Sequence, residues 1–174
     1  MPLFRETGIV EDPWQKLDDD APVPADGMVL VSFARWREAR AALLARGGPV
    51  GVALANTDPV EALASDTARL DLITLHFPKF SDGRAYSQAR LLRERLGYQG
   101  ELRATGNVLQ DQALFMLRCG FDSFESDQKG FGEALVRAHK LFSVVYQPTE
   151  DGRTPVSLLR LKRPVARALH AQRQ

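Results

Sequence analysis

The feature that most constrains the fold is a regular alternation between short apolar runs and amphipathic helical patterns. After each run, apolar residues recur at helical spacing, as Ala85, Ala89, Leu92 and Leu96 do on one face. Parallel strands need long crossover connections, and a helix between consecutive strands supplies one, so the pattern predicts repeated βαβ units. The runs occupy residues 28–33, 50–55, 70–77, 101–106 and 121–126.

These units predict an α/β fold with five parallel strands beginning near residues 28, 50, 70, 101 and 121. Eight such units would close a barrel, and five are too few. We therefore expect an open, mostly parallel five-stranded sheet with helices on both faces. A partial barrel-like βα sheet is the alternative.

The chain ends differ from the centre in composition. Residues 1–27 are rich in turn-forming residues and predict an irregular arm, with room for one short strand near 3–10. Residues 28–148 then form a single α/β domain, which 174 residues are enough to build around a real core. Residues 149–174 form a basic C-terminal tail with one more helix-like piece at 164–172.

Composition excludes several classes of protein. The formal net charge of +1 gives no bulk attraction to nucleic acid. The only cysteine, Cys119, cannot form an internal disulfide, and we expect it to be a structurally inert, buried residue. No apolar run approaches the roughly 20 residues of a membrane span, and the N-terminus does not resemble a signal peptide. The expected location is the cytoplasm.

Polar residues follow the run at 70–77, where a parallel sheet places its ligands. Ser81 can cap the helix that follows, and Asp82 suits its positive end. Lys79 and Arg84 have no role in capping, because cations oppose the dipole of a helix N-terminus. They therefore indicate either a bound anion or an ordinary solvated surface.

Arg103 lies inside the run at 101–106, although a central parallel strand is normally apolar on both faces. It must face a site, form an internal ion pair, or lie on an edge strand. Consecutive strands tend to be neighbours, so we predict one anion site shared by both runs. The competing interpretation pairs Asp82 with Arg103. The predicted anion-binding residues are Lys79, Ser81, Asp82, Arg84, Arg103, Asn107 and Gln112.

Cofactor motifs are missing from the sequence. It has no glycine-rich dinucleotide fingerprint, no phosphate-binding loop, no nucleophile elbow and no metal-ligand spacing. We therefore predict no cofactor and no metal, and we assign no catalytic residue.

Three phrases carry a resemblance to a known family: FPKFSDGRAYSQARLLR, GELRATGNVLQDQ and RCGFDSF. They resemble the bacterial domain-of-unknown-function family nine-three-four, most closely over residues 70–126. Members are often labelled as oxidoreductases involved in sulfite reduction. The resemblance implies a link to assimilatory sulfur metabolism and to the sulfite reductase haemoprotein subunit. It implies no established catalytic residues.

Three functions remain open. The first is an accessory protein of sulfite reduction that binds the reductase or a small oxyanion. The second is an oxidoreductase that uses a bound flavin or a partner's electrons, with His76, Asp82 or Asp111 as proton donors. The third is a structural interaction protein that makes its contacts through the charged termini. A membrane partner and nucleic acid are not expected, and a homodimer is compatible with the sequence.

Overall fold

The computed structural model describes residues 1–141, 145–146, 149 and 152–162. Its centre is an eight-stranded sheet with the spatial order β2-β1-β8-β7-β6-β5-β4-β3. The strands are β1 (Leu3–Arg5), β2 (Gly8–Val10), β3 (Trp14–Lys16), β4 (Met28–Ser32), β5 (Val50–Leu54), β6 (Leu72–Phe77), β7 (Glu101–Gly106) and β8 (Ser123–Glu125).

Strands β3 to β8 are parallel and lie in chain order, whereas β1 pairs antiparallel with both β8 and β2. The five predicted strands are confirmed as β4 to β8, each starting within two residues of its expected position. The sheet is longer than expected because residues 1–27 add β1, β2 and β3, where we anticipated an irregular arm with at most one short strand.

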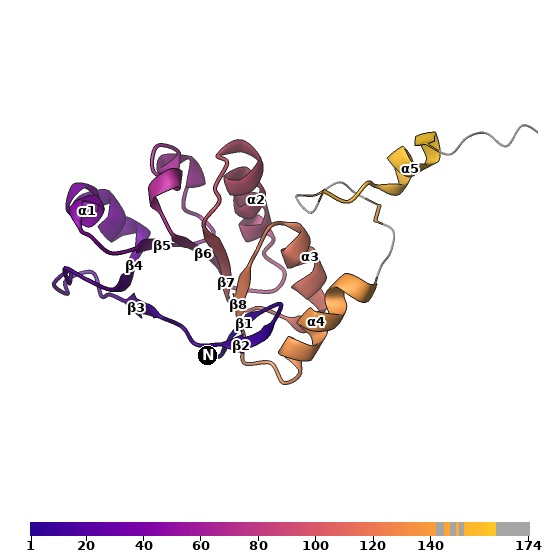
Figure 1. The fold of residues 1–174 in the computed structure, drawn as a ribbon, viewed down its shortest axis with the longest axis horizontal. Coiled ribbons are helices and arrows are strands. Elements are labelled where there is room, and N and C mark those ends of the chain that lie inside the picture. The colour runs from indigo at the N-terminus through magenta and orange to yellow at the C-terminus, as the bar shows by residue number, and fades with distance from the viewer. Residues whose placement is uncertain (142–144, 147–148, 150–151, 163–174) are drawn as a thin grey trace, which may run out of the picture.

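The strand order explains the overall shape. Right-handed crossovers that always advance in the same direction place every helix on the same side of the sheet. A doubly wound sheet needs a reversal of strand order, and strands β3 to β8 contain none. Helices α1 to α4 accordingly follow the outer face of a curled sheet (Figure 1). The α/β class and the mostly parallel sheet are confirmed, and the partial barrel-like arrangement is the one that fits.

The connecting helices are short. Among the described residues, none is long and apolar enough to cross a membrane. The predicted helix-like piece at 164–172 lies outside the described residues. The α-helices are α1 (Phe33–Ala45), α2 (Arg84–Arg90), α3 (Ala113–Arg118), α4 (Phe131–Leu141) and α5 (Val156–Lys162). The 3-10 turns are η1 (Val60–Leu63), η2 (Thr67–Arg69) and η4 (Gln110–Gln112), and η3 (Leu91–Arg95) is a π-helical continuation of α2.

The apolar core lies between the outer face of the sheet and the helices. Alternate residues of a strand point to opposite faces, so Ile73, Leu75 and Phe77 of β6 meet the helices, and all three are fully buried. Trp36 of α1 and Leu92 of η3 pack into the same cluster. The opposite, concave face receives the other set of strand residues, and on β7 that set is polar.

Residues 11–13 span the open side of the curled sheet. They connect β2 at one sheet edge to β3 at the other, and Figure 1 shows this segment passing across the concave side. We call residues 11–13 the strap. The N-terminal residues are therefore part of the architecture that covers the concave face.

Candidate functional site

The concave face gathers polar side chains because of strand register. Arg103 shares its face of β7 with Glu101 and Thr105, two residues away on either side. It is in register with Thr74 of β6 and Ser123 of β8. The polar alternation noticed in the sequence thus becomes one buried polar cluster rather than an exposed edge.

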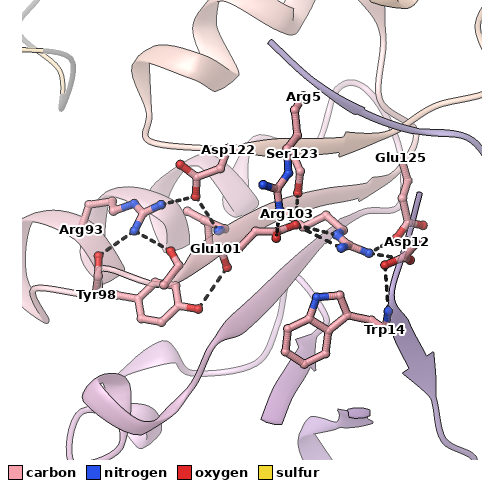
Figure 2. Close-up of polar contacts among 12 residues, drawn as sticks. Arg5, Asp12, Trp14, Arg93, Tyr98, Glu101, Arg103, Asp122, Ser123 and Glu125 are labelled. Atoms are coloured by element: carbon pink, nitrogen blue, oxygen red, sulfur yellow. Dashed lines mark hydrogen bonds and ion pairs between the residues drawn. The ribbon is translucent and has the colours of Figure 1, made fainter. Parts of the chain in front are cut away.

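Arg103 is the centre of this cluster, and only 1% of its side chain is exposed. Its Nη1 donates to the Asp12 Oδ2 atom at 2.8 Å and to Glu125 Oε1 at 3.4 Å. Its Nε and Nη2 both donate to Glu101 Oε1, at 3.2 and 3.1 Å. Figure 2 shows these carboxylates converging on the guanidinium from β7, β8 and the strap.

Glu101 links the cluster to the N-terminal strands. Its carboxylate accepts a 2.5 Å hydrogen bond from the Ser123 hydroxyl and forms an ion pair with Arg5 of β1. Burial by itself lowers the pKa of the Arg103 guanidinium, but the Asp12 hydrogen bond and the neighbouring carboxylate charges outweigh burial and leave that pKa raised. Arg103 therefore stays charged inside the protein, held by carboxylates from three segments.

Asp12 brings the strap against Arg103 on the concave side. The Trp14 backbone N–H donates to Asp12 Oδ1 at 3.2 Å, which turns the other Asp12 oxygen toward Arg103. The Trp14 ring lies against Gly51 of β5, where an added Cβ would be 3.1 Å from the ring. Gly51 therefore permits a close approach that any side chain would obstruct.

A second arginine, Arg93, connects the loops that precede β7 and β8. Arg93 of η3 donates to the backbone oxygens of Tyr98, Gly100 and Gly120 and forms a 2.6 Å ion pair with Asp122 (Figure 2). All of these acceptors except Asp122 are backbone carbonyls. Arg93 therefore acts as a structural clamp between loops.

The loop after β6 contains a compact ion pair of its own. Arg84 Nη2 lies 2.7 Å from Asp82 Oδ2, and Asn56 donates to the same oxygen at 2.7 Å. The Arg84 hydrogen bond is the main reason that the pKa of Asp82 falls to about 2. Helix α2 begins at Arg84 with no side-chain cap, so the expected Ser81 cap is wrong, and Asp82 instead accepts from the Arg84 backbone N–H at 3.3 Å.

Hydrogen bonds join this loop to the one after β7. The Asn107 backbone N–H donates to the Phe77 carbonyl at 2.7 Å, and Gln112 donates to the Phe80 carbonyl at 3.0 Å. The predicted meeting of the two loops at the carboxyl edge is therefore present. The predicted residues at this edge lie on these two loops and on the first residues of the helical segments that follow them: Lys79, Ser81, Asp82, Arg84, Asn107 and Gln112.

Arg103 does not join this set. It lies three residues before the end of β7, which corresponds to about 10 Å along the strand. Asp82 is paired with Arg84, and Arg103 is paired with Asp12, Glu101 and Glu125. The internal ion pair that we weighed for Arg103 is thus present, but with partners other than Asp82. Anion binding at the carboxyl edge remains a prediction.

Sequence reasoning missed the partners of Arg103. Glu101 could have been found, because residues i and i+2 of a strand share a face. Asp12 could not, since 91 positions separate it from Arg103 and only the folded sheet brings them together.

The carboxyl edge also exposes two large aromatic side chains. Phe80 is 60% exposed and Phe115 of α3 is 42% exposed. A line of rings leads from the core to this surface: Phe77 contacts Tyr86 at 5.0 Å between ring centroids, and Tyr86 contacts Phe115 at 4.8 Å. We call Phe80 and Phe115 the aromatic pair. Phe80 lies in the loop after β6, and Phe115 lies on the helix that follows β7.

Fold and site together define the class: an α/β half-barrel with a buried arginine–carboxylate cluster on its concave face. The chain belongs to the family described as bacterial protein of unknown function (DUF934), whose model matches residues 51–157, more than half of the chain. The match includes Arg103 and the aromatic pair, whereas the strap precedes it. A comparison with curated proteins gives no match.

Proposed function

We propose that this protein is an accessory protein of assimilatory sulfite reduction that binds a partner protein through the carboxyl edge of its sheet. The partner we propose is the sulfite reductase haemoprotein subunit, which the family resemblance indicates. The observation that carries the binding role is the aromatic pair, because Phe80 and Phe115 remain exposed on well-held segments.

Isolated exposed apolar residues are common and need no explanation. This pair differs because the Gln112 side chain ties the Phe80 backbone to the turn that precedes α3, the helix that carries Phe115. The segments that carry the two side chains are therefore joined by a hydrogen bond. Aromatic residues are enriched at protein interfaces, where they bury a large area at low conformational cost.

The charges beside the aromatic pair suit an acidic partner surface. Lys79 is exposed, and no ion pair of this residue is found in the described part of the chain. Arg84 adds a second cation whose charge Asp82 largely compensates. An acidic rim on the partner would speed association and fix orientation, with a smaller effect on affinity.

The test is binding of the purified protein to the immobilised sulfite reductase haemoprotein subunit. We expect the Phe80→Ser/Phe115→Ser double variant to bind at least about tenfold more weakly, which corresponds to roughly 1.4 kcal/mol. Ile9→Ser is the matched control, because Ile9 is 72% exposed on β2 and should leave affinity unchanged. Failure of the wild type to bind contradicts the partner, and an equal loss in Ile9→Ser contradicts the surface.

Binding of a small oxyanion at the same edge is the other mode of the proposed function. It is supported by Lys79, Ser81 and Asn107, which are all exposed where the two loops meet. Calorimetric titration of sulfite, sulfate and phosphate into wild type and Lys79→Ala tests it. Saturable binding that the variant loses supports an edge site, and no heat with any of the three anions contradicts it.

A further inference from the structure

We infer that Arg103 forms the floor of a masked oxyanion site on the concave face, and that Asp12 of the strap occupies this site as an internal substitute for a ligand carboxylate. The site is distinct from the carboxyl edge and does not depend on the proposed partner. The ligand class is a molecule with a carboxylate or another small oxyanion head.

The hydrogen bonds of the guanidinium distinguish its fixed partners from the replaceable one. Glu101 takes Nε and Nη2 and is itself held by Ser123 and Arg5, so it belongs to the wall of the site. Nη1 points to Asp12 at 2.8 Å, with Glu125 farther away at 3.4 Å. The Asp12 carboxylate is therefore the nearest partner of Nη1.

Asp12 is held by a cradle of two donors. One oxygen accepts from Arg103 Nη1 and the other from the Trp14 backbone N–H. A guanidinium together with a backbone N–H is a common arrangement for binding an oxyanion. Neither donor belongs to Asp12, so both remain when the Asp12 side chain is removed.

The exposure of Asp12 and the charge of the cluster both permit a free anion to replace the Asp12 carboxylate. The Asp12 side chain is 38% exposed although Arg103 is 1% exposed, so solvent reaches the carboxylate but not the arginine behind it. A monovalent oxyanion in place of the Asp12 carboxylate would leave the net charge of the cluster unchanged. The strap residues 11–13 lie in none of the strands, so moving them breaks no β-ladder.

Wild type should respond weakly to free anions, because a tethered carboxylate competes at a high effective concentration. The test therefore uses Asp12→Ala, which empties the cradle and leaves both donors in place. Acetate and sulfate are titrated at constant ionic strength against chloride, and the melting temperature is measured. A ligand that binds only the folded state at ten times its Kd should raise Tm by about 3–6 °C.

Two controls make the test specific. The Asp12→Ala/Arg103→Met double variant lacks the floor of the site and should lose the anion-dependent rise. Asp20→Ala removes one exposed acidic residue outside the strap and should respond as wild type does. If Asp12→Ala does not fold, Asp12→Gly serves in its place, because it also leaves both donors free.

A rise in Tm with acetate or sulfate that is confined to Asp12→Ala or Asp12→Gly supports the site, and the stronger anion reports whether a carboxylate or a tetrahedral head fits. An Asp12→Ala variant that responds no more than wild type overturns it, since Glu125 has then closed on Nη1. Equal responses from Asp12→Ala and Asp20→Ala overturn it as well, because the effect is then one of overall charge.

Discussion

Replacing Arg103 with methionine removes the charge that three carboxylates share while keeping a side chain of similar length. The structure predicts a large loss of stability. The Arg103 side chain is 1% exposed, and its nearest carboxylate oxygens lie at 2.8, 3.1 and 3.4 Å. In the variant, Asp12, Glu101 and Glu125 would face one another across the space that the guanidinium fills.

The expected loss of stability depends on which partners and how much contact with water each carboxylate keeps in the variant. Removing one partner of a buried ion pair typically costs about 3–5 kcal/mol. Glu101 keeps Arg5 and Ser123 as partners, and the other two side chains retain 38% and 26% of their exposure to water. We therefore expect the lower end, about 3 kcal/mol in the free energy of unfolding. Arg84→Met is the matched control, because its side chain is 57% exposed and exposed ion pairs contribute little to stability.

The assay is urea unfolding at pH 7, followed by circular dichroism, with midpoint and slope fitted together. Adding Asp12→Asn and Glu125→Gln to Arg103→Met should recover part of the loss, since the remaining cost comes from uncompensated negative charge. The reasoning is refuted if Arg103→Met loses no more stability than Arg84→Met. It is also refuted if neutralising the two carboxylates recovers nothing.

Three further predictions concern the carboxyl edge and the helices. The folded-state pKa of Asp82 is about 2, below its ordinary 3.8, so the stability that Asp82 contributes is present above about pH 4 and is lost as pH falls through 2. Arg84→Ala should raise the pKa of Asp82 toward 3.8, as measured by NMR titration, and Ser81→Ala is the control. Gly120→Ala should destabilise by more than about 1 kcal/mol in urea unfolding, because Gly120 has a φ of +92° and the new Cβ would lie 2.8 Å from Arg93; an unchanged midpoint would contradict the clamp. Cys119→Ser should cost about 1–3 kcal/mol by placing a hydroxyl at a fully buried position, and reductase binding should be retained; lost binding with folding intact would show that the thiol has a functional role.

The comparison of predicted and observed strands shows which parts of the sheet can be predicted from short stretches of sequence. Strands β4 to β8 were predictable because each apolar run and the helix pattern after it lie within one short stretch of chain. Of the N-terminal strands, only one short strand near residues 3–10 was expected, because β1, β2 and β3 have three residues each and no amphipathic helix pattern follows them. The pairing of β1 with β8 could not be expected, since Leu3 and Glu125 lie far apart in the chain. The turn-rich composition of residues 1–27 correctly indicated irregular connections, but it did not indicate that strands of this segment would pair with the rest of the sheet.

Arg103 illustrates the same division at the site. The sequence alone determined that Arg103 needs a charged partner, a ligand or a place on an edge strand, because an unpaired charge in the core is too costly. Only the tertiary structure decided that Asp12, Glu101 and Glu125 supply the compensation. The choice between Asp82 and Asp12 depends on how far Arg103 lies from the carboxyl end of β7 and on which segment crosses the face that its side chain points to. The path of the strap is a tertiary property, because residues 91 positions apart meet only after the sheet has curled.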